Sequence, residues 1–440
     1  LHKEYRRQRQ MCIRDSLSVF LLTFSHDHES SGPNFNERPY FRILSTFLCE
    51  WAEIRQAHFA EFVSNEEEAR RLDQFSYQLY DTLAEFFLVL QPAAFPGFTF
   101  AWMCLVSHRM FMPMLLEQGA ESHSKKGSWD KAAALLVALL KFQSGYVVGK
   151  EIPEAVTVIY KGTIRIFLVL LHDFPDFLAE YSFQLVGSMS QMFIQLRNVV
   201  LSATPENVSV PDPYQPGFKA DAIREITINP VIAGHPEQLL IQTGIKKSID
   251  IYFRVPSDHL LDQILLVLKL GVPSSGSGIG YKGTHYDLKL LNSLVLYIGL
   301  TAIEEKPHSN ISFNSKSSQV ALLISLMQKA DIELQFQILQ SMANNLSYPN
   351  SLTHWFSSIF LYFFGLKSLS QTNEDVQQVI TRVLLERIIC NKPHPWGVVV
   401  TFIELLGNKN YDFFDLPFTK TDSDFKRIFS SLRTHFSGKV

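Results

Sequence analysis

A histidine beside two carboxylates is the first group in this sequence that could do chemistry. The run from His172 to Asp176 places one imidazole and two carboxylates within five positions. Such a group could transfer protons or hold a metal ion. However, Asp173 lies two residues before Pro175, where a helix is expected to end. Asp176 falls in the first turn of the next helix, where a carboxylate interacts well with the helix dipole. We therefore interpret both carboxylates as helix-end residues.

His394 and Trp396 form a second candidate group, in a corner that also contains Pro393 and Pro395. The two prolines predict that one helix stops near Cys390 and that Pro395 stands in the first turn of the next. No nearby Cys, Ser or carboxylate pair completes a catalytic mechanism. We interpret the imidazole and the indole as caps of a helical hairpin, with contact to a partner protein as the alternative.

Arg197 and Asn198 interrupt an otherwise apolar helix predicted over residues 192–203. A buried arginine needs a partner, because unpaired charge is costly to bury. One interpretation pairs Arg197 with the Pro-rich segment that follows it, and the other exposes it to a binding partner. The partner-binding candidates are therefore Arg197, Asn198, His394 and Trp396.

Other motifs in the sequence give weaker indications of a functional site. Residues 278–283 read G-I-G-Y-K-G, a formal G-x-G-x-x-G, but the preceding residues 259–270 predict a helix where dinucleotide binding needs a strand. We interpret the motif as a surface loop. The chain has 4 Cys, far apart and without a C-x-x-C pair, so neither a zinc site nor a disulfide framework is expected. The sequence predicts no enzyme, no metal, no cofactor and no small-molecule substrate.

Composition narrows the class of protein further. Of 440 residues, 46% are hydrophobic and 19% charged, which argues against a disordered chain, and the formal net charge of −3 offers no electrostatic footprint for nucleic acid. Apolar runs such as 132–140 are too short to cross a bilayer, so we expect a soluble protein without a membrane span. The basic residues 1–16 look non-native and are left outside the fold.

Hydrophobic positions recur with a period of 3.6 along nearly the whole chain, as in Leu72, Phe75, Leu79 and Leu83. This pattern, interrupted by proline, glycine and serine clusters, predicts an all-α fold of HEAT-like stacked antiparallel helix pairs in an elongated, two-lobed array. Five prolines between 204 and 230 suggest a break. We predict an N-terminal lobe at 17–203, a Pro-rich connection at 204–230 and a C-terminal lobe at 231–440.

Six separated blocks carry a family resemblance. They are PGFTFAWMCLVSHRMFMPMLL, IYKGTIRIFLVLLHDFPDFLAEY, IQLRNVVLSATP, PDPYQPGFK, YPNSLTHWFS and RVLLERIICNKPHPWGVVVTFIELL. In this order they resemble, nearly residue for residue, the C-terminal domain of the Not-one scaffold family of the Ccr–Not mRNA deadenylase complex. Ser209 stands where that family commonly carries a basic residue.

The resemblance implies a non-catalytic scaffold that binds the heterodimer of the Not-two and Not-three/five subunits. Their extended segments would wrap the helical array and so support mRNA deadenylation, mRNA decay, translational repression and transcription regulation in the cytoplasm, including its mRNA-decay granules, and in the nucleus. Two alternatives remain open: an RNA-binding helical-repeat module, which needs a basic stripe, and a hydrolase or nuclease, which needs clustered carboxylates.

Overall fold

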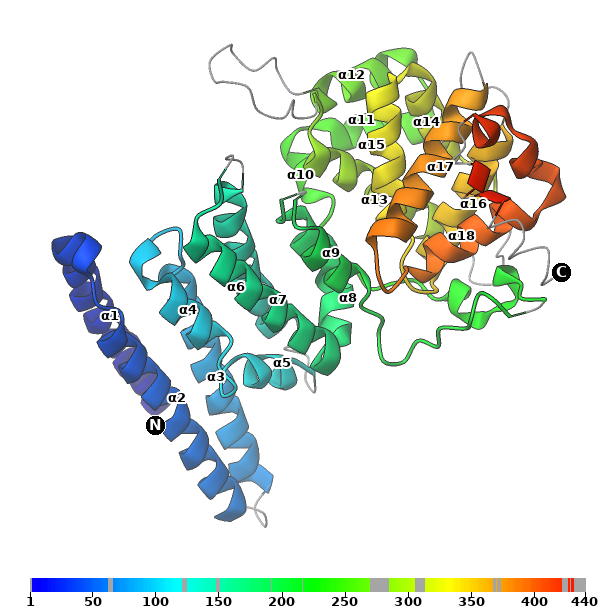
Figure 1. Cartoon of the computed structure of the whole chain (residues 1–440). Coiled ribbons are helices and arrows are strands. Elements are labelled where there is room, and N and C mark those ends of the chain that lie inside the picture. The colour runs from blue at the N-terminus through cyan, green and yellow to red at the C-terminus, as the bar shows by residue number, and fades with distance from the viewer. Residues whose placement is uncertain are drawn as a thin grey trace. The chain divides into compact units, whose positions relative to one another are not determined.

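The chain is almost entirely helical in the computed structural model (Figure 1). The structure describes residues 2–61, 66–120, 125–147, 151–190, 192–215, 217–269, 285–304, 313–366, 369, 373–421, 426–427 and 429–430. Within these ranges β pairing is limited to an isolated bridge between Lys269 and Tyr286. The predicted all-α class is therefore confirmed. The predicted loop at 278–283 lies outside the described residues.

The chain divides into two compact units. The first comprises residues 1–177 with 188–192, and the second comprises 178–187 with 193–440. This division comes earlier in the chain than residue 203, where the sequence places the end of the N-terminal lobe. The predicted lobe limits stay a prediction.

The first unit contains a series of helices that begins at His2. They are α1 (His2–Ser31), α2 (Arg38–Glu61), α3 (Glu66–Val89), α4 (Thr99–Val106), α5 (Met112–Ala120), α6 (Lys125–Tyr146) and α7 (Glu154–Asp173), and α8 (Pro175–Gly187) starts in this unit and continues in the second. Helix α1 runs through residues 2–16 without a break. Residues 2–16, predicted to be non-native and to lie outside the fold, are helical, and their non-native origin stays a prediction.

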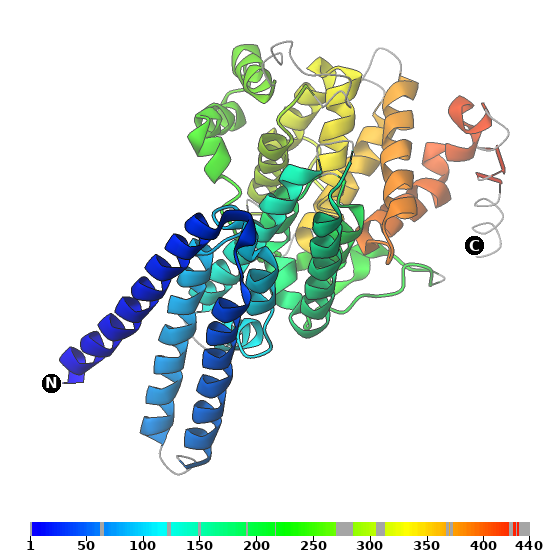
Figure 2. The same cartoon turned by 60° about the vertical axis from the view of Figure 1, so that its left-hand side comes forward.

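Aromatic side chains fill the core of the first unit, and helices α2 and α3 run side by side in it (Figure 2). Two buried tryptophans also satisfy their indole N–H groups. Trp102 donates to the carbonyl of Phe87 at 2.7 Å, and Trp129 donates to that of Leu116 at 3.0 Å. These bonds tie neighbouring helices together without leaving a buried donor unpaired.

Helix α7 differs from the prediction that no segment could cross a membrane. It has 20 residues, and an 18-residue window in it has a mean hydropathy of 1.5 and is 28% buried, so by length and composition α7 passes as a candidate span. A single helix of this kind is weak evidence, because core helices pass the same test. Val156, Ile159, Thr163, Phe167 and Leu170 are buried at intervals of three and four, so one face of α7 packs inward.

The run from His172 to Asp176 lies at the α7–α8 junction, as predicted. Helix α7 ends at Asp173, α8 begins at Pro175, and Asp176 is in its first turn. His172 Nδ1 lies 2.6 Å from Asp173 Oδ1 on exposed side chains. The two aspartates thus occupy helix ends, as the sequence analysis interpreted them.

The second unit stacks its helices in two layers. Its elements are α9 (Ile194–Leu201), α10 (Gln238–Gln242), α11 (Ile245–Arg254), α12 (Asp258–Leu268), α13 (Leu288–Glu304), α14 (Ser318–Lys329), α15 (Ile332–Ala343), α16 (Ser351–Gly365), α17 (Asn373–Cys390) and α18 (Trp396–Gly407). Helices α13, α15 and α17 lie side by side, and α16 packs beside α18 (Figure 1). Such contacts between every second helix of the chain are what stacked helix pairs produce.

Candidate functional site

The α17–α18 corner is rigid because its tryptophan is buried. Helix α17 ends at Cys390, as predicted, and Pro395 immediately precedes α18, one position before the predicted first turn. Trp396 is only 7% exposed, its Nε1 donates to the carbonyl of Pro211 at 2.9 Å, and its ring meets Phe218 edge-on at 6.2 Å. The indole therefore fastens the Pro-rich connection to the start of α18.

Gly397 lets α18 approach its neighbours closely. Its N–H donates to the carbonyl of Ser347 at 2.8 Å, and a Cβ on it would lie 2.5 Å from Thr353 Cγ2 and 3.0 Å from the backbone of Leu346. A side chain does not fit there without a shift of backbone. The Trp-Gly pair of the predicted corner thus combines a buried anchor with a close helix contact.

The Pro-rich connection is also fastened to the N-terminal end of α16. The carboxylate of Asp221 lies 2.7 Å from His354 Nε2. Ser351 donates twice, from its hydroxyl to Asn229 Oδ1 at 2.6 Å and from its N–H to the carbonyl of Ile228 at 3.0 Å. These contacts are spread along the segment, so it lies over the helices rather than hanging free as a linker.

A groove of about 770 Å³ lies between the Pro-rich connection, α16 and α18. We call it the connection groove. Its walls mix apolar and polar side chains, and its lining residues include Tyr214, Phe218, His354, Leu361, Tyr362, Ile403, Glu404 and Tyr411. Burial, and then Asp212, raise the pKa of Tyr214; burial, and then Glu404, raise the pKa of Tyr411. Both phenols therefore stay neutral at physiological pH and can donate hydrogen bonds.

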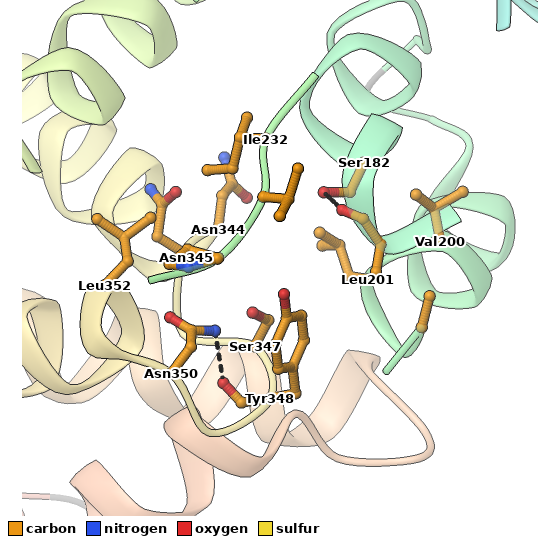
Figure 3. Close-up of a pocket in the computed structure, with 14 residues that line it drawn as sticks. Ser182, Val200, Leu201, Ile232, Asn344, Asn345, Ser347, Tyr348, Asn350 and Leu352 are labelled. Atoms are coloured by element: carbon orange, nitrogen blue, oxygen red, sulfur yellow. Dashed lines mark hydrogen bonds between the residues drawn. The ribbon is translucent and has the colours of Figure 1, made fainter. Parts of the chain in front are cut away.

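A second, much smaller cavity lies between α9, residues 230–232 and the 344–352 segment (Figure 3). Its volume is about 50 Å³, enough for water but below the roughly 300 Å³ at which ligand pockets begin. Asn350 donates to the carbonyl of Tyr348 at 2.8 Å beside it (Figure 3). Asn350 Oδ1 also caps α16 by accepting from the N–H of Thr353. We assign this cavity no ligand.

Arg387 on α17 is buried, and its Nε and Nη2 groups are hydrogen-bonded. It is 8% exposed, and its guanidinium donates to Gln340 Oε1 at 3.0 and 2.7 Å, to the carbonyl of Gln340 at 3.1 Å and to Asn344 Oδ1 at 2.7 Å. Its partners are neutral. Burial, and then the positive charge of Arg197, lower the pKa of Arg387 to about 10. Two cationic side chains therefore lie near each other where α9 meets α17.

Arg197 and Asn198 are on the α9 side of that contact. The Nδ2 group of Asn198 donates to the carbonyl of Cys390, which joins α9 to the end of α17. Asn198 Oδ1 and Arg197 Nε are both enclosed without a hydrogen-bond partner. Burial lowers the pKa of Arg197. The predicted pairing of Arg197 with the Pro-rich segment is not among the contacts of the described residues, where no ion pair to Arg197 occurs.

The four predicted candidates thus gather around the C-terminal end of α17, but in different settings. Arg197 and Asn198 approach it from α9, Trp396 is buried in the corner, and His394 is exposed, with Nδ1–H donating to the carbonyl of Asn391 at 2.8 Å. Their role in partner binding stays a prediction. Across the described ranges, no group of three or more His, Cys, Asp or Glu residues could hold a metal ion.

Sequence reasoning missed Arg387 and the connection groove. Arg387 stands in an amphipathic helix pattern that indicates an exposed side chain, and its acceptors come from a helix more than forty positions away. The groove depends on a Pro-rich segment that is hydrogen-bonded to side chains more than 130 positions later in the chain. The one available signal was the density of prolines next to the apolar α16 and α18 sequences.

Comparison with known proteins agrees with this architecture. A family model described as "CCR4-Not complex component, Not1" matches residues 61–433. The chain is 38% identical over 428 residues to the General negative regulator of transcription subunit 1 of Saccharomyces cerevisiae; the match covers 96% of this chain and 20% of that protein. The chain therefore spans about a fifth of the length of that relative.

Two solved structures share the fold. One is described as the Not1 C-terminal domain in complex with Not4. It superposes on this chain with a TM-score of 0.77 and is 38% identical in sequence, and the match covers 93% of this chain and 80% of that chain. The other is the NOT1 superfamily homology domain from Chaetomium thermophilum. It superposes with a TM-score of 0.78 and is 29% identical in sequence, and the match covers 95% of this chain and 79% of that chain. The helical layers, the fastened Pro-rich connection and the family match over most of the chain lead to one conclusion: the chain belongs to the Not1 family of CCR4-Not complex components.

Proposed function

We propose that this chain is a non-catalytic scaffold domain that docks the Not-two and Not-three/five heterodimer. Its family membership supports this, and so does the Not1 C-terminal domain that was solved in complex with Not4, a protein of this fold with another protein bound. A Not4-type subunit is therefore a further partner. Through these subunits the domain would support mRNA deadenylation, mRNA decay and translational repression in the cytoplasm and the nucleus.

The connection groove is the observation that carries the proposal. An extended peptide needs a long surface with apolar pockets for alternate side chains and polar groups for its backbone. Leu361 and Ile403 supply apolar contact, and Tyr411 supplies a hydrogen-bond donor. The groove is held open by the Trp396 and Asp221 contacts rather than by the peptide, so less ordering entropy is lost on binding.

The test is isothermal titration of the purified chain with the intact heterodimer and with partners that lack their extended segments. We expect binding by the intact pair and at least tenfold weaker binding by the truncated pair, because linked segments add affinity through effective concentration. No heat and no co-elution with the intact pair would contradict the proposal. Equal affinity of the truncated pair would contradict the role of extended segments.

A groove variant refines the test. Ile403→Asp places a charge on the partly buried wall of α18 and should weaken binding, whereas Leu266→Asp on α12 alters a side chain that is 71% exposed and away from the groove. Both variants should keep the helical circular dichroism of the parent. If both bind as the parent does, the extended segments use another surface.

A further inference from the structure

Arg197 is a charged side chain that no described carboxylate neutralises. It stands on α9, partly exposed, with Nε enclosed and without a hydrogen-bond partner. No ion pair to it occurs among the described residues. An arginine keeps its proton at physiological pH, and enclosing a charge without a partner is unfavourable. Since only Nε is fully enclosed, the Nη end of the guanidinium is the part that a ligand can reach.

The surroundings of Arg197 add positive charge. Arg387 is close enough for the two charges to affect each other, and its Nε and Nη2 groups donate to Gln340 and Asn344. Glu386 is the nearby carboxylate, but it already accepts from Arg382 at 2.8 Å and from Gln340 at 3.1 Å. One guanidinium end is therefore left for an external anion.

We propose that Arg197 receives the carboxylate of one Asp or Glu in the extended segment of a docked subunit; this rests on the proposed scaffold function. A guanidinium and a carboxylate match as two parallel hydrogen bonds, so one free guanidinium end takes one carboxylate. A phosphate would require several basic groups that it can reach, and the side chain of Arg387 is buried. The docked carboxylate would reduce the excess positive charge where α9 meets α17.

The first experiment needs no partner. Arg197→Met keeps the length of the side chain and removes its charge. We expect the melting temperature of the free chain to rise by about 2–4 °C, because the variant removes an unpaired charge beside Arg387. Arg254→Met, at an exposed arginine of α11, is the control and should leave the melting temperature within about 1 °C. A fall in the melting temperature of Arg197→Met would overturn the proposal, since it would show that Arg197 already has a stabilising role in the free chain.

The second experiment measures binding of the Not-two and Not-three/five heterodimer. We expect Arg197→Met to weaken the affinity about tenfold or more, Arg197→Lys to weaken it less, and Arg254→Met to leave it unchanged. Each Asp and Glu in the partners' extended segments is then changed to Lys, and one of these changes should be compensated by Arg197→Glu. A merely structural arginine would show no such compensation, and unchanged affinity in Arg197→Met would overturn the proposal.

The two proposals fail in distinguishable ways. If the parent chain does not bind the heterodimer, the proposed scaffold function fails for that pair, and the same variants are measured against a Not4-type subunit. An affinity for that subunit that depends on Arg197 would then support the carboxylate receptor. If the binding of neither partner depends on Arg197, the proposed carboxylate receptor is overturned.

Discussion

The α17–α18 corner and the α9 surface that it meets differ in whether their enclosed polar atoms have hydrogen-bond partners. In the corner, Trp396 and Arg387 are buried, and the indole N–H of Trp396 and the Nε and Nη2 groups of Arg387 all have acceptors. On α9, Arg197 and Asn198 each leave one enclosed polar atom without a hydrogen-bond partner. A satisfied polar group contributes to the stability of the free chain, whereas an unsatisfied one is tolerated where another molecule completes it. The comparison separates a structural region from a candidate binding region.

Trp396→Ala should break the structural side of this comparison most strongly. Removing a buried indole costs about 3–5 kcal/mol of unfolding free energy, and here the Pro-rich connection also loses its fastening at Pro211. Urea denaturation measures the loss. Trp396→Phe is the matched variant, and it should lose less because the ring remains. An unchanged denaturation midpoint in Trp396→Ala would make the indole dispensable for stability.

Arg387→Met should destabilise the chain, in contrast to Arg197→Met. The substitution leaves Gln340 Oε1 and Asn344 Oδ1 without their donor in a buried site, which costs about 2–3 kcal/mol, reduced in part because the repulsion with Arg197 disappears. Arg382→Met, at an exposed pair with Glu386, should cost less than about 1 kcal/mol. Equal effects of the substitutions at Arg387 and Arg197 would remove the distinction between the two regions.

Gly397→Ala tests the close approach at the start of α18. The added methyl would meet Thr353 Cγ2 and the backbone of Leu346, and such overpacking typically costs about 1–3 kcal/mol. Thr353→Ser in the same chain removes the nearer methyl and should recover part of the loss. Gly407→Ala, where the new methyl meets nothing within 4 Å, is the control. The denaturation midpoints of the four proteins decide the matter.

Asn198→Ala should have the smallest effect. The substitution loses the hydrogen bond to the carbonyl of Cys390, which destabilises the chain, and removes an enclosed acceptor that has no donor, which stabilises it. The free energy of unfolding should therefore change by less than about 1 kcal/mol. Thermal unfolding beside the parent chain measures it. A loss as large as that of Trp396→Ala would place Asn198 in the structural region after all.

Helix positions and the hairpin corner could be predicted from local sequence. The end of α17 at Cys390 follows from prolines that restrict the backbone at the next few residues, and the aspartates at 173 and 176 follow from the same rule. The family resemblance was also readable, because six blocks occur in one order. What these signals share is that a residue acts on neighbours within one or two helical turns.

The remaining features depended on residues that are distant in sequence. Composition and periodicity determined that this chain buries apolar faces as stacked helices, since a helix with one apolar stripe must pack on another. Only the tertiary structure decided that Arg387 donates to Gln340 of α15 while Arg197 Nε has no hydrogen-bond partner among the described residues. It also decided that the Pro-rich connection lines a groove with α16 and α18. Hydrophobic burial specifies which face turns inward but not which polar atoms then meet, because hydrogen bonds act over a few ångströms between side chains that only the complete packing brings together.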